Sequence, residues 1–416
     1  MAQPGKQGTC EEDNLRRIAL PVALMAALAL IFGACQPAAS PAPGDTPGAQ
    51  TPGAETPGTQ TPGAETPGAE TPGTQTPGGE TPGTETPGTT PGGGEGFLAC
   101  MVSDVGGIDD RSFNENAWAG MQMAEQQLGV EVRFLASASQ EDYARNINQH
   151  INDGCNMIVT VGFLLGDDTY TAAQNNPDVR FAIVDYAYGT DEQPDLPNLE
   201  GLIYATEEAA MLAGYASASW SRTGVMGTFG GIQIPPVTAF MDGFLAGANY
   251  YNEQKGANVR VLGWDGSSGS FTGNFDSLDD ARELTVGMLQ ENADVILPVG
   301  GPIGQGTFAA IQDQGAEAVG LGVDVDWTET VPQYSDLMLT HILKRIDNSV
   351  FLAIERAVNG EAPQPFFLNN LENEGVGLGE FHDYEGDITD ETRSELEQLQ
   401  QDIIDGNVVV SEWINP

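Results

Sequence analysis

A short loop that begins at Asp104 gathers side chains of several chemical types. In the stretch MVSDVGGIDDRSFNENAW, residues 101–118, Asp104 is followed within ten positions by Ser112, Phe113 and Asn114. Carboxylates accept hydrogen bonds, hydroxyl and amide groups both donate and accept them, and a phenyl ring offers a flat apolar face. The loop is therefore a candidate site for a small ligand.

The elements around this loop place it at the end of a strand. Residues 97–102 are an apolar run typical of a buried strand, and Gly106 and Gly107 allow a sharp turn after it. Ser112 or Asn114 can cap a helix that continues through Trp118. In open α/β sheets, ligands bind at the carboxyl ends of the strands.

Strand and helix patterns alternate along the rest of the chain. Strands are predicted at residues 97–102, 130–135, 157–161, 180–184 and 202–204, with helices at 115–128, 140–153 and 168–175. The order then starts again, with strands at 224–228, 259–262, 295–298 and 318–323 and helices at 237–251, 278–291 and 304–314. A strand at 337–342, helices at 347–358 and 394–404, and a short strand at 408–410 follow. Two doubly wound α/β halves with parallel sheets are expected.

Most of the predicted strands end in polar, aromatic or glycine residues. Besides Asp104, these candidates are Gly162, Phe163, Asp185, Phe229, Gly230, Gly300, Gly301 and Asp324. Taken singly, an Asp after a strand is often a turn or helix cap. Their recurrence predicts a cleft between the two halves, lined by strand ends.

The first hundred residues have a different composition. Lys6, Arg16 and Arg17 precede an apolar run at residues 18–32, which is typical of a secretory signal and short for a membrane span. Small residues before Cys35 resemble a bacterial lipobox, so residues 1–34 are predicted to be a signal peptide and Cys35 to carry lipid. A cleaved signal with an incidental cysteine is the alternative. Residues 46–88 repeat Thr-Pro-Gly-x-x, which predicts a disordered tether over 35–96.

Charge and cysteine usage limit the possible partners. The formal net charge of −45 repels phosphate backbones, so nucleic acid is not an expected partner. Cys100 and Cys155 either neighbour each other or are separate buried thiols, and we favour separate thiols. The three histidines, His150, His341 and His382, are scattered along the chain, and no Cys/His spacing indicates zinc. No cofactor is expected.

Several separated motifs together resemble one protein family. DVGGIDDRSFNENAWAG is similar to the opening motif of the basic membrane protein family of lipoproteins, whose known members include purine nucleoside receptors. The resemblance continues through VGFLLGDDTYTAAQNNPDVRFAIVD, GGIQIPPVTAFMDGFLAGANY, GNFDSLDDARELTVGMLQENADVI and GLGVDVDW, and covers nearly all of residues 97–360. It implies a type I periplasmic-binding-protein fold, with two Rossmann-like lobes joined by hinge strands. We expect a first lobe of residues 97–204 plus about 343–362 and a second of 205–342 plus about 363–416.

The resemblance also implies roles for individual residues around a nucleoside. The candidates are Phe113 and Phe275 for the faces of the base, Asp104 and Asn114 for its edge, and Asp324 and Lys344 for the ribose. Carboxylates accept hydrogen bonds from hydroxyls and lysine donates them, so these types suit a polyol. Asp109 and Asp110 are interpreted as a surface turn.

The function that these expectations imply is binding without catalysis. The chain would be a lipid-anchored, extracytoplasmic solute-binding protein that delivers a purine nucleoside to the permease and ATPase of an ABC importer. Two alternatives stay open: a ligand sensor of the same fold, and a secreted nucleoside hydrolase, because DVGGIDD resembles the calcium loop of those enzymes. A dinucleotide dehydrogenase is discounted because no GxGxxG follows a strand.

Overall fold

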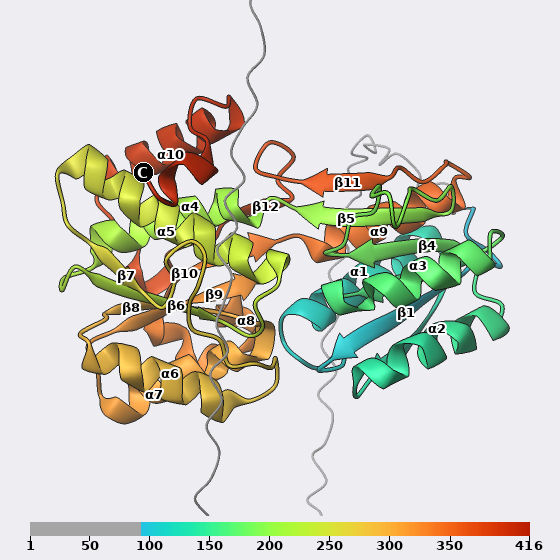
Figure 1. Cartoon of the computed structure of the whole chain (residues 1–416), viewed down its shortest axis with the longest axis horizontal. Coiled ribbons are helices and arrows are strands. Elements are labelled where there is room, and N and C mark those ends of the chain that lie inside the picture. The colour runs from blue at the N-terminus through green and yellow to red at the C-terminus, as the bar shows by residue number, and fades with distance from the viewer. Residues whose placement is uncertain (1–92) are drawn as a thin grey trace, which may run out of the picture. The chain divides into compact units, whose positions relative to one another are not determined.

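Residues 93–416, which the computed structural model describes, contain two six-stranded sheets (Figure 1). The first sheet has the order β11-β5-β4-β3-β1-β2, with β1 (Leu98–Val105), β2 (Glu131–Ser137), β3 (Met157–Val161), β4 (Arg180–Val184), β5 (Leu199–Tyr204) and β11 (Phe366–Asn369). The second has the order β12-β10-β9-β8-β6-β7, with β6 (Val225–Gly230), β7 (Arg260–Leu262), β8 (Val295–Val299), β9 (Val319–Asp324), β10 (Met338–Lys344) and β12 (Val376–Leu378). All neighbouring strands run parallel except β10 and β12. The predicted α/β class with two parallel sheets is confirmed.

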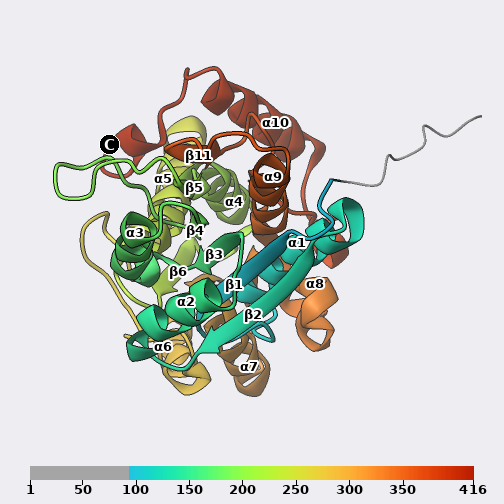
Figure 2. The same cartoon turned by 90° about the vertical axis from the view of Figure 1, so that its right-hand side faces the viewer.

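Helices cover both faces of each sheet. The first lobe is the first sheet with α1 (Phe113–Leu128), α2 (Tyr143–Asn152), α3 (Gly166–Asn175) and α9 (Ile346–Val358). The second lobe is the second sheet with α4 (Thr206–Trp220), α5 (Pro235–Lys255), α6 (Leu278–Gln290), α7 (Gly304–Gln314), α8 (Trp327–Thr330) and α10 (Asp390–Ile404). Figure 2 shows α1 and α9 on one side of the first sheet and α2 and α3 on the other.

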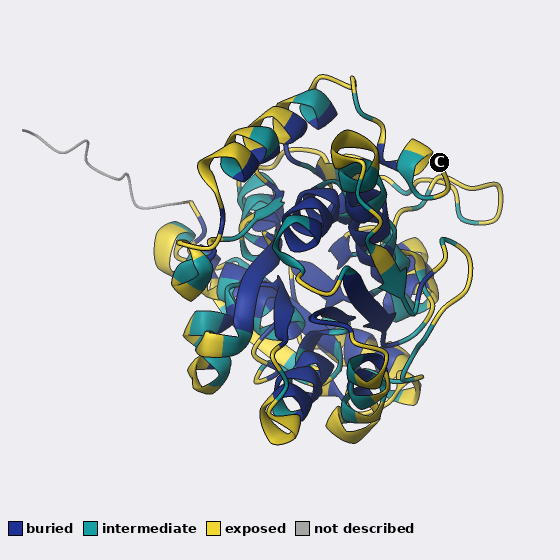
Figure 3. Ribbon diagram, turned by 90° about the vertical axis from the view of Figure 1, so that its left-hand side faces the viewer, coloured by how far each residue is buried: buried dark blue, intermediate teal, exposed yellow. Residues whose placement is uncertain are grey.

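The alternating side chains of β1 explain this layering. Ala99 and Met101 pack in one apolar cluster with α1, while Cys100 and Val102 pack in another with α2 and α3. A strand buried on both faces reads as a continuous apolar run, which is why the sequence predicted it well. Figure 3 shows the buried strands enclosed by helices whose outer faces are exposed.

Helix α4 was missing from the sequence prediction. It is rich in alanine and buried on most of its surface, so it lacks the apolar stripe that marks an amphipathic helix. Glycines on α4 and on α5 allow these two helices to pack closely against each other. A side chain at Gly214 would collide with the carbonyl of Phe244, and one at Gly247 would collide with the carbonyl of Met211.

The chain crosses between the sheets three times, between β5 and α4, between β10 and α9, and between β11 and β12. The third crossing corrects an expectation. Residues from about 363 onward were placed in the second lobe, but β11 pairs with β5 in the first sheet. Residues 408–410 were also predicted as a strand, whereas a 3-10 helix, η6, occupies Val410–Trp413.

The expectations for the first residues fall outside the described part. The signal peptide, Cys35 and the Thr-Pro-Gly segment up to residue 92 lie before residue 93. Within residues 93–416, no helix combines the length and the hydropathy that a membrane span requires.

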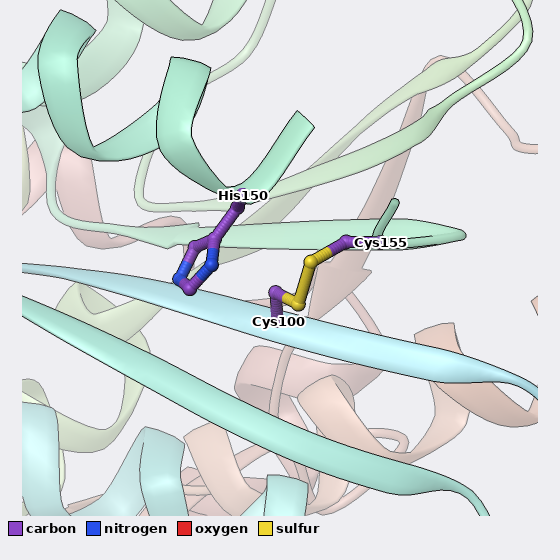
Figure 4. Close-up of side chains that lie close together, drawn as sticks. All are labelled: Cys100, His150 and Cys155. Atoms are coloured by element: carbon purple, nitrogen blue, oxygen red, sulfur yellow. A yellow bond between two sulfur atoms is a disulfide. The ribbon is translucent and has the colours of Figure 1, made fainter. Parts of the chain in front are cut away.

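The two cysteines of the first lobe form a disulfide (Figure 4). Cys100 lies on β1 and Cys155 lies just before β3, the strand beside it, with 6.0 Å between their Cα atoms. The expectation of two separate thiols is therefore wrong. Apolar runs alone do not show which strands will be neighbours, and the pairing of β1 with β3 is what brings the two cysteines together.

Replacing both cysteines with alanine should destabilise the first lobe. The bond closes a loop with a sequence separation of 55, so its loss should lower the free energy of unfolding by about 2–4 kcal/mol. Urea unfolding with and without a reductant measures this: the reductant should shift the midpoint of the wild-type chain but not that of the variant. Equal midpoints for both chains without reductant would show that the bond contributes nothing.

Candidate ligand-binding site

A pocket of about 620 Å³, part of it open to solvent, lies where the carboxyl ends of strands from both sheets meet. Eleven of the fourteen candidate residues line it: Asp104, Phe113, Asn114, Gly162, Phe163, Asp185, Phe275, Gly300, Gly301, Asp324 and Lys344. The two sheets share one strand order, and residues at the ends of corresponding strands line this pocket.

Three predicted residues do not line the pocket. Phe229 is fully buried and packs with Ala281 in the core of the second lobe, so its placement in the site was wrong. The space beside Gly230 is filled by Val237. Ser112 is also fully buried and acts through Asp324, to which its hydroxyl donates a hydrogen bond of 2.8 Å.

Asp110 organises the loop after β1. Its carboxylate is buried and accepts hydrogen bonds from the backbone N–H groups of Ser112, Asn114 and Glu115 at 2.9–3.0 Å. It therefore satisfies free donors at the beginning of α1, where a negative charge is also favourable. The interpretation of Asp110 as a surface turn is wrong, whereas Asp109 is exposed.

Asp104 and Asn114 form a hydrogen-bonded pair at the edge of the pocket. The amide nitrogen of Asn114 donates to Asp104 at 2.8 Å and to Asp110 at 3.1 Å. The pKa of Asp104 is raised to about 8 by burial, which outweighs the lowering effect of the Asn114 amide, with a smaller contribution from the charge of Asp110. Asp104 is therefore protonated near pH 7 and has an O–H to donate. The Oδ1 atom of Asn114 is buried without a partner, so it has an acceptor to offer.

Asp324 and Asp185 occupy equivalent places in the two lobes. Asp324 ends β9 and Asp185 follows β4, and these two strands hold the same position in their sheets. The φ angles of Asp324 and Asp185 are 70° and 72°. This left-handed backbone is uncommon for residues other than glycine, and Asp and Asn tolerate it best. Burial raises the pKa of Asp324 to about 6, although Lys344 and the Ser112 hydroxyl lower it.

Lys344 is the one positive charge among the residues that line the pocket. Its side chain is 2% exposed, and its ammonium donates to Asp185 at 2.7 Å. It also lies 5.0 Å from the ring centre of Phe113 and 4.7 Å from that of Tyr204. Since Lys344 ends β10 in the second sheet and Asp185 follows β4 in the first, the pair connects the two lobes.

Aromatic and aliphatic groups form the remaining walls. Phe113 comes from the first lobe and Phe275 from the second, and the Gly300–Gly301 turn lies close to both. The beginning of α5 adds a wall that the sequence analysis missed: Ile234, Pro236, Val237 and Phe240. The prolines in GGIQIPP, placed after a strand end and at the first helical position, were a usable signal for it.

Comparison with known proteins assigns the family. The model of one family, Bmp, described as ABC transporter substrate-binding protein PnrA-like, matches residues 97–412. The chain belongs to the Bmp family. The resemblance to the basic membrane protein family is thus confirmed, and this Bmp protein is an ABC transporter substrate-binding protein.

The relatives of this Bmp protein agree with that assignment. It is 28% identical over 330 residues to the ABC transporter nucleoside-binding protein BmpA of Lactococcus lactis, covering 75% of this chain and 88% of that protein. It is also 28% identical to an uncharacterized lipoprotein of Pyrococcus horikoshii, covering 74% of this chain and 76% of that one. A solved ABC transporter solute-binding protein of Aeropyrum pernix matches with 26% identity and a TM-score of 0.68, covering 75% and 92% of the two chains.

Proposed function

We propose that this chain binds a purine nucleoside between its two lobes and delivers it, unchanged, to the permease and ATPase of an ABC importer. A lipid on Cys35 would hold it at the outer face of the cell membrane, with the Thr-Pro-Gly segment as a tether. The signal-like run, the small residues before Cys35 and the lipoprotein name of a relative support this anchor.

The observation that carries the proposal is the pairing of aromatic rings with carboxylates in one pocket. Phe113 and Phe275, from opposite lobes, offer two flat faces for a base. At the base edge, the O–H of protonated Asp104 donates to a ring nitrogen, and the free Oδ1 of Asn114 accepts an N–H. On the ribose side, Asp324 accepts from hydroxyls and Lys344 donates to them.

Binding between the lobes also provides a way to signal occupancy. The ligand would contact Asp104 and Phe113 in the first lobe and Phe275 and Asp324 in the second. A molecule that touches both lobes stabilises the closed arrangement over the open one, by its difference in affinity for the two. The importer then recognises the closed shape.

Native mass spectrometry of the whole chain mixed with equal amounts of purine nucleosides, pyrimidine nucleosides, bases and ribose tests the proposal. One purine nucleoside per chain, recovered intact, is the expected result. Preferential retention of another class of molecule would overturn the ligand assignment. Release of free base, measured with and without calcium, would show a hydrolase instead.

Nucleoside affinity should depend on the protonation of Asp104. Because the pKa of this carboxyl is raised to about 8, affinity should fall as pH rises from 7 through 8 and above, where the group ionises and loses its O–H. Isothermal titration between pH 7 and 9.5, above the pKa of about 6 of Asp324, measures it with a nucleoside whose base does not titrate in that range, such as adenosine.

The matched control is Asp104→Asn. An amide keeps a hydrogen-bond donor at the same place and does not titrate, so the variant should bind with a flat pH profile. A variant whose affinity declines above pH 8 as steeply as that of the wild type would show that another group is responsible.

A further inference from the structure

Three potential metal ligands meet behind β9 and β10, outside the nucleoside pocket. Asp326 precedes α8, His341 lies in the middle of β10, and His382 begins the 3-10 helix η5 (His382–Tyr384). One ligand atom from each lies within 4.8 Å of the others. The histidines are scattered in sequence, and the antiparallel return through β12 is what brings His382 beside β10.

The buried imidazole of His341 is what marks this group as a site. Its side chain is 0% exposed, and neither ring nitrogen has a hydrogen-bond partner. Its Nε2 lies 3.6 Å from a carboxylate oxygen of Asp326, which is too far for a hydrogen bond. Burying an imidazole without partners is costly, so a group that fills the space between these atoms would remove that cost.

The other two ligands are already oriented and reachable. His382 Nε2 donates to Asp326 at 2.6 Å, and the hydroxyl of Thr328 donates to the other carboxylate oxygen at 2.6 Å. The side chains of Asp326 and His382 are 27% and 28% exposed, so an ion can enter from solvent. Gly322 leaves the room that the ring of His341 needs, because any side chain there would collide with it.

We propose that Asp326, His341 and His382 bind one divalent transition-metal ion of the Zn²⁺ class. Two imidazoles and a carboxylate are ligand types that Zn²⁺ takes, in contrast to Mg²⁺ and Ca²⁺, which prefer oxygen. Water would complete the coordination.

Such an ion would fasten three segments that are distant in sequence. It would tie η5, and through it α10, to β10 and to the segment after β9. Those two strands end in Lys344 and Asp324, so the ion would support the second-lobe side of the pocket from behind. Structural metal sites stabilise the folded state because the unfolded chain cannot assemble them.

Zinc stoichiometry of the whole, chelator-treated chain tests the proposal. The chain is strongly acidic, so titrations with Zn²⁺ should contain excess Mg²⁺ and Ca²⁺ to occupy scattered carboxylates. The wild type should bind one additional Zn²⁺ per chain compared with each of the variants His382→Gln and Asp326→Asn. Zinc should also raise the unfolding midpoint of the wild type and not that of these two variants.

His150 provides the matched control, because it is the only other histidine in the chain. It lies beside the Cys100–Cys155 disulfide, whose bonded sulfur atoms are not free thiolates for a metal (Figure 4). Its Nε2 is 3.0 Å from the carbonyl of Met101. His150→Gln should therefore bind zinc as the wild type does. Equal stoichiometry and equal zinc-induced shifts in the wild type, His382→Gln and Asp326→Asn would overturn the proposal.

Discussion

Lys344→Met is expected to lower the free energy of unfolding by about 3–5 kcal/mol and to weaken nucleoside binding at least tenfold. The substitution keeps most of the apolar stem but removes the ammonium that pairs with Asp185, whose side chain is only 7% exposed. Without the ammonium of Lys344, the buried carboxylate of Asp185 has no opposite charge beside it. Urea unfolding and isothermal titration measure the two effects separately.

The double variant Lys344→Met, Asp185→Asn separates stability from binding. Asparagine removes the orphaned charge and tolerates the left-handed backbone at position 185, so most of the lost stability should return. Binding should stay weak because no donor has been restored to the ribose side. Wild-type stability in the single variant, or wild-type affinity in the double variant, would contradict these roles.

Phe113→Ala should weaken the binding of purine nucleosides by about 5- to 150-fold and should change the affinity for free ribose only slightly. Stacking on an aromatic ring contributes about 1–3 kcal/mol per base, and this ring lines the pocket beside Lys344. Competition binding with a nucleoside and with ribose measures the two losses.

Two further variants show whether the flat face matters. Phe113→Leu keeps apolar bulk without a π face, so it should recover only part of the affinity. Phe275→Ala should resemble Phe113→Ala, because Phe275 lines the pocket from the opposite lobe. If Phe113→Ala weakens the binding of the nucleoside and of ribose equally, the ring of Phe113 acts by packing and not by stacking on the base.

Most of the fold could be predicted because its strands are buried on both faces. β3, β4 and α7 begin and end where the apolar periodicity places them. The pattern failed where that periodicity is absent. The alanine-rich α4 is buried nearly all round, and β11 and β12 are short strands whose partners are distant in sequence.

The strand-end rule located the pocket but not every residue in it. Asp185 follows β4 and Asp324 ends β9, the equivalent strand, and both residues line the pocket. Phe229, near the end of β6, packs in the core instead. Side chains alternate along a strand, so a shift of one residue decides between the core and the cleft. Here the predicted strand ended at residue 228, whereas β6 ends at Gly230.

Contacts between distant segments were the least predictable. The Cys100–Cys155 bond depends on which strands become neighbours, and the approach of His341 to His382 depends on an antiparallel return through β12. Neither relation leaves a local trace in the sequence.

Isothermal titration of the purified chain with purine nucleosides, pyrimidine nucleosides, free bases and ribose tests the central claim most directly. The account predicts one site per chain, with a purine nucleoside bound more tightly than its base or its ribose alone, because both lobes contribute contacts. Saturable binding of a sugar or another solute, with no measurable binding of any purine nucleoside, would contradict it.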